Sequence, residues 1–110
     1  MLINPFVASA GSLFASMVKS DSETTLIGEE TLGGYYGHTG HIPVTYKLPN
    51  SNFLLTFSIV DIEQDVKKIE DQKLGDGVKP DFRIIQPFTD FINKKDTQLN
   101  FTIKKIKSKR

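Results

Sequence analysis

The stretch that decides the fold is residues 6–14, which read Phe-Val-Ala-Ser-Ala-Gly-Ser-Leu-Phe. Before it, the apolar residues of 2–7 predict a short buried strand, which the Asn4-Pro5 pair bends or places at a sheet edge. After it, apolar side chains recur at helical spacing and predict an amphipathic helix over residues 10–20. Thr24–Ile27 is β-branched and apolar and predicts a second strand. Strand, helix and strand form one βαβ step, whose two strands are expected to be parallel.

A glycine-rich loop and a hairpin follow this step. Five of the eight glycines fall within residues 28–40, which is typical of a long loop with special backbone angles. Residues 42–46 alternate between apolar and other positions, and residues 53–60 return after the turn-forming residues 48–52. Two such runs around one turn predict a β-hairpin.

The last part of the chain leaves two assignments open. Residues 61–73 are charged, with loosely spaced apolar positions, and fit either a solvated helix or a mobile insert. Phe82–Ile85 predicts a short strand. The spacing of residues 99–106 fits a closing helix with Asp96 or Thr97 as its N-cap, although the alternation at its start also fits a strand.

Composition excludes several classes of function. The net charge of +1 creates no field that would favour nucleic acid, and the basic run Lys104–Arg110 is typical of a solvated helix end. Without cysteine the chain has no disulfide, no thiol catalysis and no cysteine-ligated metal. No apolar run is long enough to span a membrane, and the first residues lack the pattern of a signal peptide. The hydrophobic fraction of 38% and the apolar start at Met1 favour a partial domain.

Ser9 stands where the predicted strand turns into the predicted helix. Such a turn would hold the hydroxyl at a fixed angle, and the start of the helix would present unpaired N–H groups and a partial positive charge. These groups could stabilise the oxyanion of an acyl-transfer reaction, and Ala10 and Gly11 would leave room for a substrate backbone. A serine before a helix is, however, most often an N-cap, so the local pattern leaves both roles open.

Several motifs, in order, resemble the C-terminal processing peptidases, the tail-specific and tricorn-like serine peptidases of family S41. Residues 6–14 are similar to the family's nucleophile segment, a strand followed by Ser-Ala-(Gly/Ala)-Glu and an apolar helix. Leu26–Gly34 resembles its strand and loop of the form hydrophobic-hydrophobic-Gly-Glu-x-Thr-x-Gly. Tyr46–Ser51 resembles its Leu-Pro-Asn-Gly hairpin, and Gly75–Asp81 its Gly-x-Gly-(Ile/Val)-x-Pro-Asp sequence. Asp96–Leu99 is similar to the Asp-x-x-Leu that opens the family's closing helix.

The resemblance extends over residues 3–106 and implies both a fold and a chemistry. The fold would be α/β, with residues 1–110 as a single partial domain: the C-terminal portion of a crotonase/Clp-protease-like fold, made of a βαβ step, a β-hairpin and a closing helix. The implied activity is that of a serine endopeptidase, with Ser9 as nucleophile and the Ala10 backbone N–H as oxyanion donor. The substrate would be a peptide or protein. No cofactor or metal is implied, and the expected location is the cell envelope or periplasm.

The sequence departs from the family pattern where a general base is expected. Many members place the lysine of a Ser–Lys dyad where this chain has Gly34, and no lysine occurs within residues 21–46. Tricorn-like members instead use a histidine from an earlier part of the domain. Ser12 also replaces the glutamate of the family's helix. We therefore expect the base to lie in a missing N-terminal half of the domain, and the isolated chain to be inactive.

Other polar residues offer weaker sites. His38 and His41 are spaced three apart, but two ligands alone rarely make a metal site. Either histidine could serve Ser9 as a base if the loop folded over it. Glu29 and Glu30 could orient a base or a substrate amine, although Glu29 matches a position that the family motif keeps.

Two other functions remain open from the sequence. The chain could be a non-catalytic peptide-binding or structural fragment. Tyr35 and Tyr36 could either line a peptide-binding cleft or pack on the hairpin. A crotonase-type acyl-CoA enzyme fits the motifs less well. A half-domain would leave a sheet edge and apolar surface uncovered, so self-association or pairing with the N-terminal half is expected.

Overall fold

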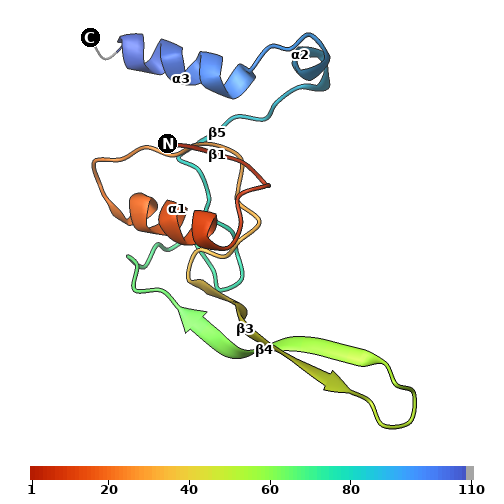
Figure 1. Ribbon diagram of the computed structural model, residues 1–110. Coiled ribbons are helices and arrows are strands. Elements are labelled where there is room, and N and C mark those ends of the chain that lie inside the picture. Colours follow the sequence, from red (N-terminus) through yellow and green to blue (C-terminus); the bar gives the residue numbers. More distant parts are fainter. Residues whose placement is uncertain (109–110) are drawn as a thin grey trace.

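The structure, a computed structural model, describes residues 1–108 (Figure 1). Its elements are, in chain order, β1 (Leu2–Ile3), α1 (Ala10–Ser20), β2 (Ile27–Gly28), β3 (Gly37–Lys47), β4 (Leu54–Glu63), β5 (Phe82–Arg83), α2 (Phe88–Ile92) and α3 (Thr97–Ser108). This mixture of helices and strands confirms the α/β class. Lys109 and Arg110, the end of the basic run, lie outside the described residues.

β1, β2 and β5 form a small parallel sheet with β2 in the middle. Leu2 lies opposite Ile27, which lies opposite Phe82 on its other side. The segment β1–α1–β2 is therefore the predicted βαβ step with parallel strands. Each strand is only two residues long, shorter than the sequence predicts. β1 ends early because Asn4 begins a turn, in which its side chain accepts the N–H of Phe6 at 2.9 Å.

The core is small and collects residues from separate segments of the chain. α1 contributes Ala15, and β1 contributes Ile3. The loops around the sheet contribute the other fully buried apolar side chains, Leu26, Tyr35 and Val78. Because α1 also buries two serines, polar contacts as well as apolar ones hold this helix in place.

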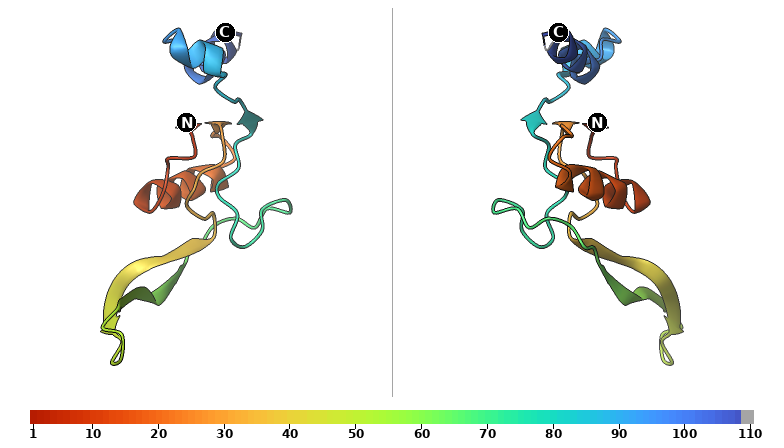
Figure 2. Two further views of the ribbon diagram at one scale, coloured as in Figure 1. Left: turned by 90° about the vertical axis from the view of Figure 1, so that its right-hand side faces the viewer. Right: turned by 90° about the vertical axis from the view of Figure 1, so that its left-hand side faces the viewer.

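The β3–β4 hairpin projects away from the rest of the chain (Figures 1 and 2). Its strands are antiparallel, with Val44 opposite Phe57 and Tyr46 opposite Leu55. β3 begins at Gly37, so the second half of the predicted glycine-rich loop is a strand, which is irregular between residues 38 and 41. The predicted hairpin is therefore present and longer than expected.

The helix alternative for residues 61–73 is wrong. Residues 61–63 complete β4, and the segment then continues as irregular backbone. Hydrogen bonds from two tyrosines keep it extended: the Tyr36 carbonyl accepts the Gln64 N–H at 2.7 Å, and the Tyr35 hydroxyl donates to the Lys67 carbonyl at 2.7 Å. These tyrosines therefore pack against the chain that follows the hairpin.

The described chain is elongated. Its radius of gyration is 17.9 Å and its extents are 64 × 36 × 19 Å, whereas a compact chain of this length has a radius of gyration of about 13 Å. The hairpin forms one end, and α2 and α3 form the other (Figure 2). Within residues 1–108, no helix combines the length and the apolar character needed to cross a bilayer.

The closing helix α3 forms as predicted, and the strand alternative for its first residues is wrong. Asp96 caps it, because its carboxylate accepts the Leu99 N–H at 2.8 Å. α3 is attached to β5 through Phe101, whose ring lies 5.9 Å from that of Phe82, and through Lys105, whose ammonium lies 3.8 Å from the Phe82 ring centroid. α2, a single short helix before it, was not among the predicted elements.

Removing the cap should weaken α3 selectively. Asp96→Ala deletes the acceptor for the Leu99 N–H and should lower the free energy of unfolding by about 1 kcal/mol. Asp96→Asn is the matched control, because asparagine caps a helix about as well as aspartate. Urea unfolding followed by circular dichroism measures both variants, and equal losses for the two would contradict a capping role.

Candidate functional site

Ser9 occupies the turn between β1 and α1 with an unusual backbone. Its φ of 51° and ψ of −128° lie outside the extended region that N-cap residues adopt, and its side chain makes no capping hydrogen bond. A positive φ at a non-glycine residue costs on the order of 1–3 kcal/mol, and such residues cluster at active sites, ligand clamps and switch regions. Ile42, Asn52 and Lys94 share a positive φ with Ser9 in the described part of the chain. Ser9 therefore lacks the hydrogen bond that defines an N-cap, and its hydroxyl group is not bonded to the first turn of α1.

The first turn of α1 leaves one backbone donor unused. The N–H groups of Gly11, Ser12 and Leu13 already donate to the carbonyls of Ala8 and Ser9 at 3.0–3.1 Å. Among residues 1–108, the Ala10 N–H has no backbone acceptor. It lies at the positive end of the helix dipole, next to the free Ser9 hydroxyl. A ligand oxygen is a suitable acceptor for such a donor.

The glycine-rich loop packs against the turn that carries Ser9. The Val7 carbonyl accepts two N–H groups from the loop, those of Leu32 at 3.0 Å and Gly33 at 3.2 Å. A Cβ atom on Gly33 would lie 2.0 Å from the Ser12 hydroxyl oxygen and 3.1 Å from the Ser9 nitrogen. Only glycine fits at this distance, so Gly33 determines how closely the loop packs against the turn.

Gly34, where related peptidases carry a lysine, is equally restricted. A Cβ atom there would lie 2.4 Å from the Gly37 carbonyl oxygen, which is too close for any side chain without movement of the backbone. Gly34 also forms a bridge with Gly77 of the following loop. The sequence has no lysine at this position, and the backbone of the loop leaves no room for one.

A glutamine holds α1 from the side of the hairpin. Gln64 directly follows β4, and its amide donates to the Leu13 carbonyl at 2.8 Å while its carbonyl oxygen accepts from the Ser16 hydroxyl at 2.9 Å. One turn further along α1, the Ser20 hydroxyl accepts the Lys67 N–H at 3.1 Å. Gln64 was not predicted from the sequence, because a single glutamine in a charged segment carries no recognisable motif.

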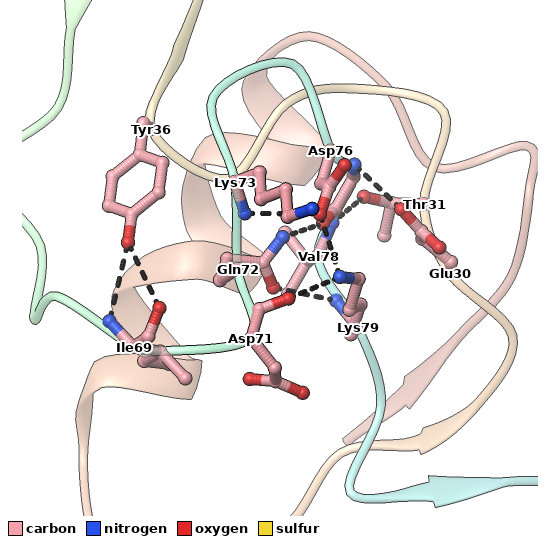
Figure 3. Close-up of polar contacts among 11 residues, drawn as sticks. Glu30, Thr31, Tyr36, Ile69, Asp71, Gln72, Lys73, Asp76, Val78 and Lys79 are labelled. Carbon is pink, nitrogen blue, oxygen red and sulfur yellow. Dashed lines mark hydrogen bonds and ion pairs between the residues drawn. The ribbon is translucent and has the colours of Figure 1, made fainter.

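Two of the sequence motifs lie side by side and form one loop cluster (Figure 3). The Glu30 carboxylate accepts the Gly77 N–H at 2.9 Å, and the Thr31 hydroxyl accepts the Val78 N–H at 2.7 Å. Gln72 bonds the same loop segment, because its amide donates to the Gly77 carbonyl at 2.5 Å. The cluster consists of these residues together with two charged neighbours, Asp76 and Lys79.

The two adjacent glutamates of this loop are both bonded within the protein. Glu30 belongs to the loop cluster, and Glu29 accepts from the Gln98 amide of α3 at 3.3 Å. These bonds link β2 to the loop cluster and to α3. A role of either carboxylate in orienting a base or a substrate amine stays a prediction.

The histidines lie on the hairpin. His38 pairs with Ile62 across the strands, and its Nδ1 atom accepts the Gly40 N–H at 3.1 Å. His41 pairs with Val60 on the same ribbon. No group of three or more potential ligands in the described part of the chain could hold a metal ion.

Replacing Ser9 by glycine tests the strained backbone. Glycine adopts a positive φ without strain, so Ser9→Gly should be more stable than Ser9→Ala by about 0.5–1 kcal/mol, after allowing for the entropy of the unfolded chain. Met17, exposed within α1, is the matched control, because there glycine should be less stable than alanine by about 1 kcal/mol. Chemical denaturation measures both pairs, and the same order at the two positions would refute the strained turn.

The ion pair of the loop cluster should make stability depend on pH. The Lys79 ammonium, 2.7 Å from the Asp76 carboxylate, and the Lys73 N–H lower the pKa of Asp76 below its ordinary 3.8. A lowered pKa means that Asp76 contributes stability above pH 3.8, and that this contribution is lost as the pH falls through the folded value. The same pair raises the pKa of Lys79, whose contribution is lost as the pH rises above 10.5.

Asp76→Asn should therefore flatten the acid side of the stability profile. Urea midpoints measured from neutral to acid pH should fall less steeply for this variant than for the parent chain. A parallel shift of the two profiles, with the same slope at low pH, would contradict the role of this ion pair.

Comparison with known proteins agrees with the motifs. A scan against protein-family models matches residues 1–84 to the family described as Peptidase family S41. A search of the curated proteins finds no match. The matched residues include the Ser9 turn, the glycine-rich loop, the hairpin and the loop cluster, and they make up most of the chain. The chain therefore belongs to peptidase family S41, whose members have a serine peptidase-type function.

Proposed function

We propose that the protein takes part in the hydrolysis of peptide bonds as a C-terminal processing endopeptidase in which Ser9 is the nucleophile. The observation that carries the proposal is the backbone of Ser9, with a φ of 51° and a ψ of −128° and no capping hydrogen bond. Serine nucleophiles at strand-to-helix turns have such strained backbones, which expose the hydroxyl oxygen above the helix start. Membership of family S41 supports the same assignment.

In this mechanism the Ser9 hydroxyl oxygen attacks the carbonyl carbon of the scissile bond while its proton passes to a general base. The carbonyl oxygen becomes an oxyanion, which the free Ala10 N–H and the helix dipole stabilise. The base then protonates the leaving amine, and an acyl-Ser9 ester remains. Water, deprotonated by the same base, hydrolyses this ester and restores the serine.

The general base comes from outside the described residues. Both histidines lie on the hairpin, and Gly34 excludes a lysine side chain from the loop. The chain then acts as the nucleophile-bearing C-terminal part of a catalytic domain with a crotonase/Clp-protease-like fold. The parallel sheet with its βαβ step supports that fold. The substrate is a peptide or protein, as the family implies.

Substitutions at Ser9, made in the polypeptide as it occurs in the cell, test the nucleophile. Ser9→Ala and Ser9→Asp should abolish peptide hydrolysis and labelling by a fluorophosphonate probe, because neither side chain can form the acyl ester. Ser22→Ala, in the exposed loop after α1, is the matched control and should keep full activity.

The isolated chain tests whether the general base lies outside these residues. The 110 residues alone should neither hydrolyse peptides nor react with the probe. Labelling of the isolated chain that disappears in Ser9→Ala would place a complete site within it and contradict the external base. Turnover that survives both Ser9 substitutions would refute the nucleophile itself.

A further inference from the structure

Three hydrogen-bond donors meet at the carbonyl oxygen of Ser9. The N–H groups of Ser12 and Leu13 donate to it at 3.0 and 3.1 Å and belong to the backbone of α1. The third donor is the Ser12 hydroxyl, at 2.8 Å. The side chain of Ser12 is therefore the one of these donors that a substitution can remove while the backbone of the helix stays the same.

The Ser9 carbonyl and the Ala10 N–H belong to the same peptide group. A peptide group is planar and almost always trans, so its C=O and its N–H point in opposite directions. Bonds that hold the Ser9 carbonyl toward α1 thus hold the Ala10 N–H away from the helix, in front of its first turn. Donors on a carbonyl also polarise the peptide group, which strengthens its N–H as a donor. The direction and the strength of the Ala10 N–H therefore depend on what binds the Ser9 carbonyl.

The orientation of this peptide group is unusual. The Ser9 ψ of −128° sets its plane, and this angle, together with the positive φ, differs from the extended backbone of ordinary N-cap residues. A strained conformation persists only where its surroundings over-determine it. The two backbone N–H donors are available to the carbonyl of any N-cap residue, so the Ser12 hydroxyl is the additional bond at this turn.

The Ser12 hydroxyl is enclosed by the chain itself. Ser12 is 0% exposed, and a Cβ atom on Gly33 would lie 2.0 Å from its hydroxyl oxygen. Water cannot reach this hydroxyl, so the Ser9 carbonyl has no solvent competitor for its hydrogen bond. Because the contact lies inside the described part of the chain, it does not depend on what covers the exposed surface.

We propose that Ser12 is a positioning residue for peptide hydrolysis, whose hydroxyl orients the Ser9–Ala10 peptide group so that the Ala10 N–H donates to the oxyanion. The inference rests on the proposed function, in which this N–H stabilises the oxyanion. In this role Ser12 acts through the peptide group and does not touch the substrate. The oxyanion forms only as the carbonyl is attacked, so loss of the Ser12 hydroxyl should slow the reaction and leave binding unchanged.

Two buried serines of α1 form a matched pair for the test. Ser16 is also 0% exposed, and its hydroxyl donates to the carbonyl three residues earlier, that of Leu13, at 2.9 Å. Ser12→Ala and Ser16→Ala thus remove the same kind of bond, one at the Ser9 peptide group and one further along the helix. Ser16 also bonds Gln64, so its loss should cost at least as much stability in urea. Both variants are made in the polypeptide as it occurs in the cell.

Labelling by a fluorophosphonate probe at increasing concentrations measures reaction and binding separately. The Ser9 oxygen bonds to phosphorus, fluoride leaves, and the phosphonyl oxygen takes the place of the oxyanion during the attack. Ser12→Ala should lower the maximal labelling rate by about 10-fold, with the half-saturating probe concentration unchanged. Ser16→Ala should keep the maximal rate of the parent polypeptide.

A variant of similar size separates the hydrogen bond from packing. Ser12→Cys fills the same space with a thiol, which is a weak donor, so it should label slowly even if the alanine variant folds poorly. Labelling of Ser12→Cys at the parent rate, or equal rates for Ser12→Ala and Ser16→Ala, would overturn this inference and leave Ser9 as the nucleophile. No labelling of the parent polypeptide, or labelling that persists in Ser9→Ala, would refute the proposed function and this inference with it.

Discussion

The structure depends on the contact between the glycine-rich loop and the turn that carries Ser9. Two loop N–H groups share the Val7 carbonyl, and Gly33 lies where any side chain would overlap the first turn of α1. This contact gives the end of β1, the start of α1 and the loop one common geometry. A strained φ persists only where its surroundings leave no room to relax, and these surroundings meet that condition. The turn that carries Ser9 therefore lies against one of the close glycine contacts of the molecule.

Directional hydrogen bonds around this contact take the place of a large apolar core. The serines on the buried side of α1, the glutamine after β4 and the loop cluster all join side chains to backbone groups, and no buried side-chain polar atom in the described part of the chain lacks a partner. Satisfied polar networks specify a geometry strictly but add little net stability, because each bond replaces one to water. The chain accordingly has a well-defined site together with an elongated shape and many exposed apolar side chains.

The sequence predicts the parts of this structure that depend on local patterns. Apolar spacing identified α1 with its bounds, alternation identified the hairpin, and the two candidate caps, Asp96 and Thr97, identified the start of α3. The position of Ser9 followed from its place between a strand and a helix, but its backbone angles did not, because they result from the loop that packs on it. Residues 61–73 have helix-compatible composition, yet the tyrosines of a distant loop accept and donate the bonds that keep the segment extended. Gln64 could not be predicted for the same reason, because Leu13 and Ser16, its partners, lie far away in the sequence. Gln72 bonds Gly77, only five residues further on, but no sequence motif marks that contact.

Gln64 also connects the hairpin to the helix that follows Ser9. Its backbone N–H donates to the Tyr36 carbonyl at the base of the hairpin, and its side chain holds the Leu13 carbonyl and the Ser16 hydroxyl of α1. The ribbon thus ends on the helix whose first turn carries Ser9 and Ala10. A two-stranded ribbon on its own is at best marginally stable in water, so its contacts with α1 also support the base of the hairpin. The Lys67 N–H adds a second contact with this helix through the Ser20 hydroxyl, so the segment that follows the hairpin holds α1 at two points, one near its middle and one at its end.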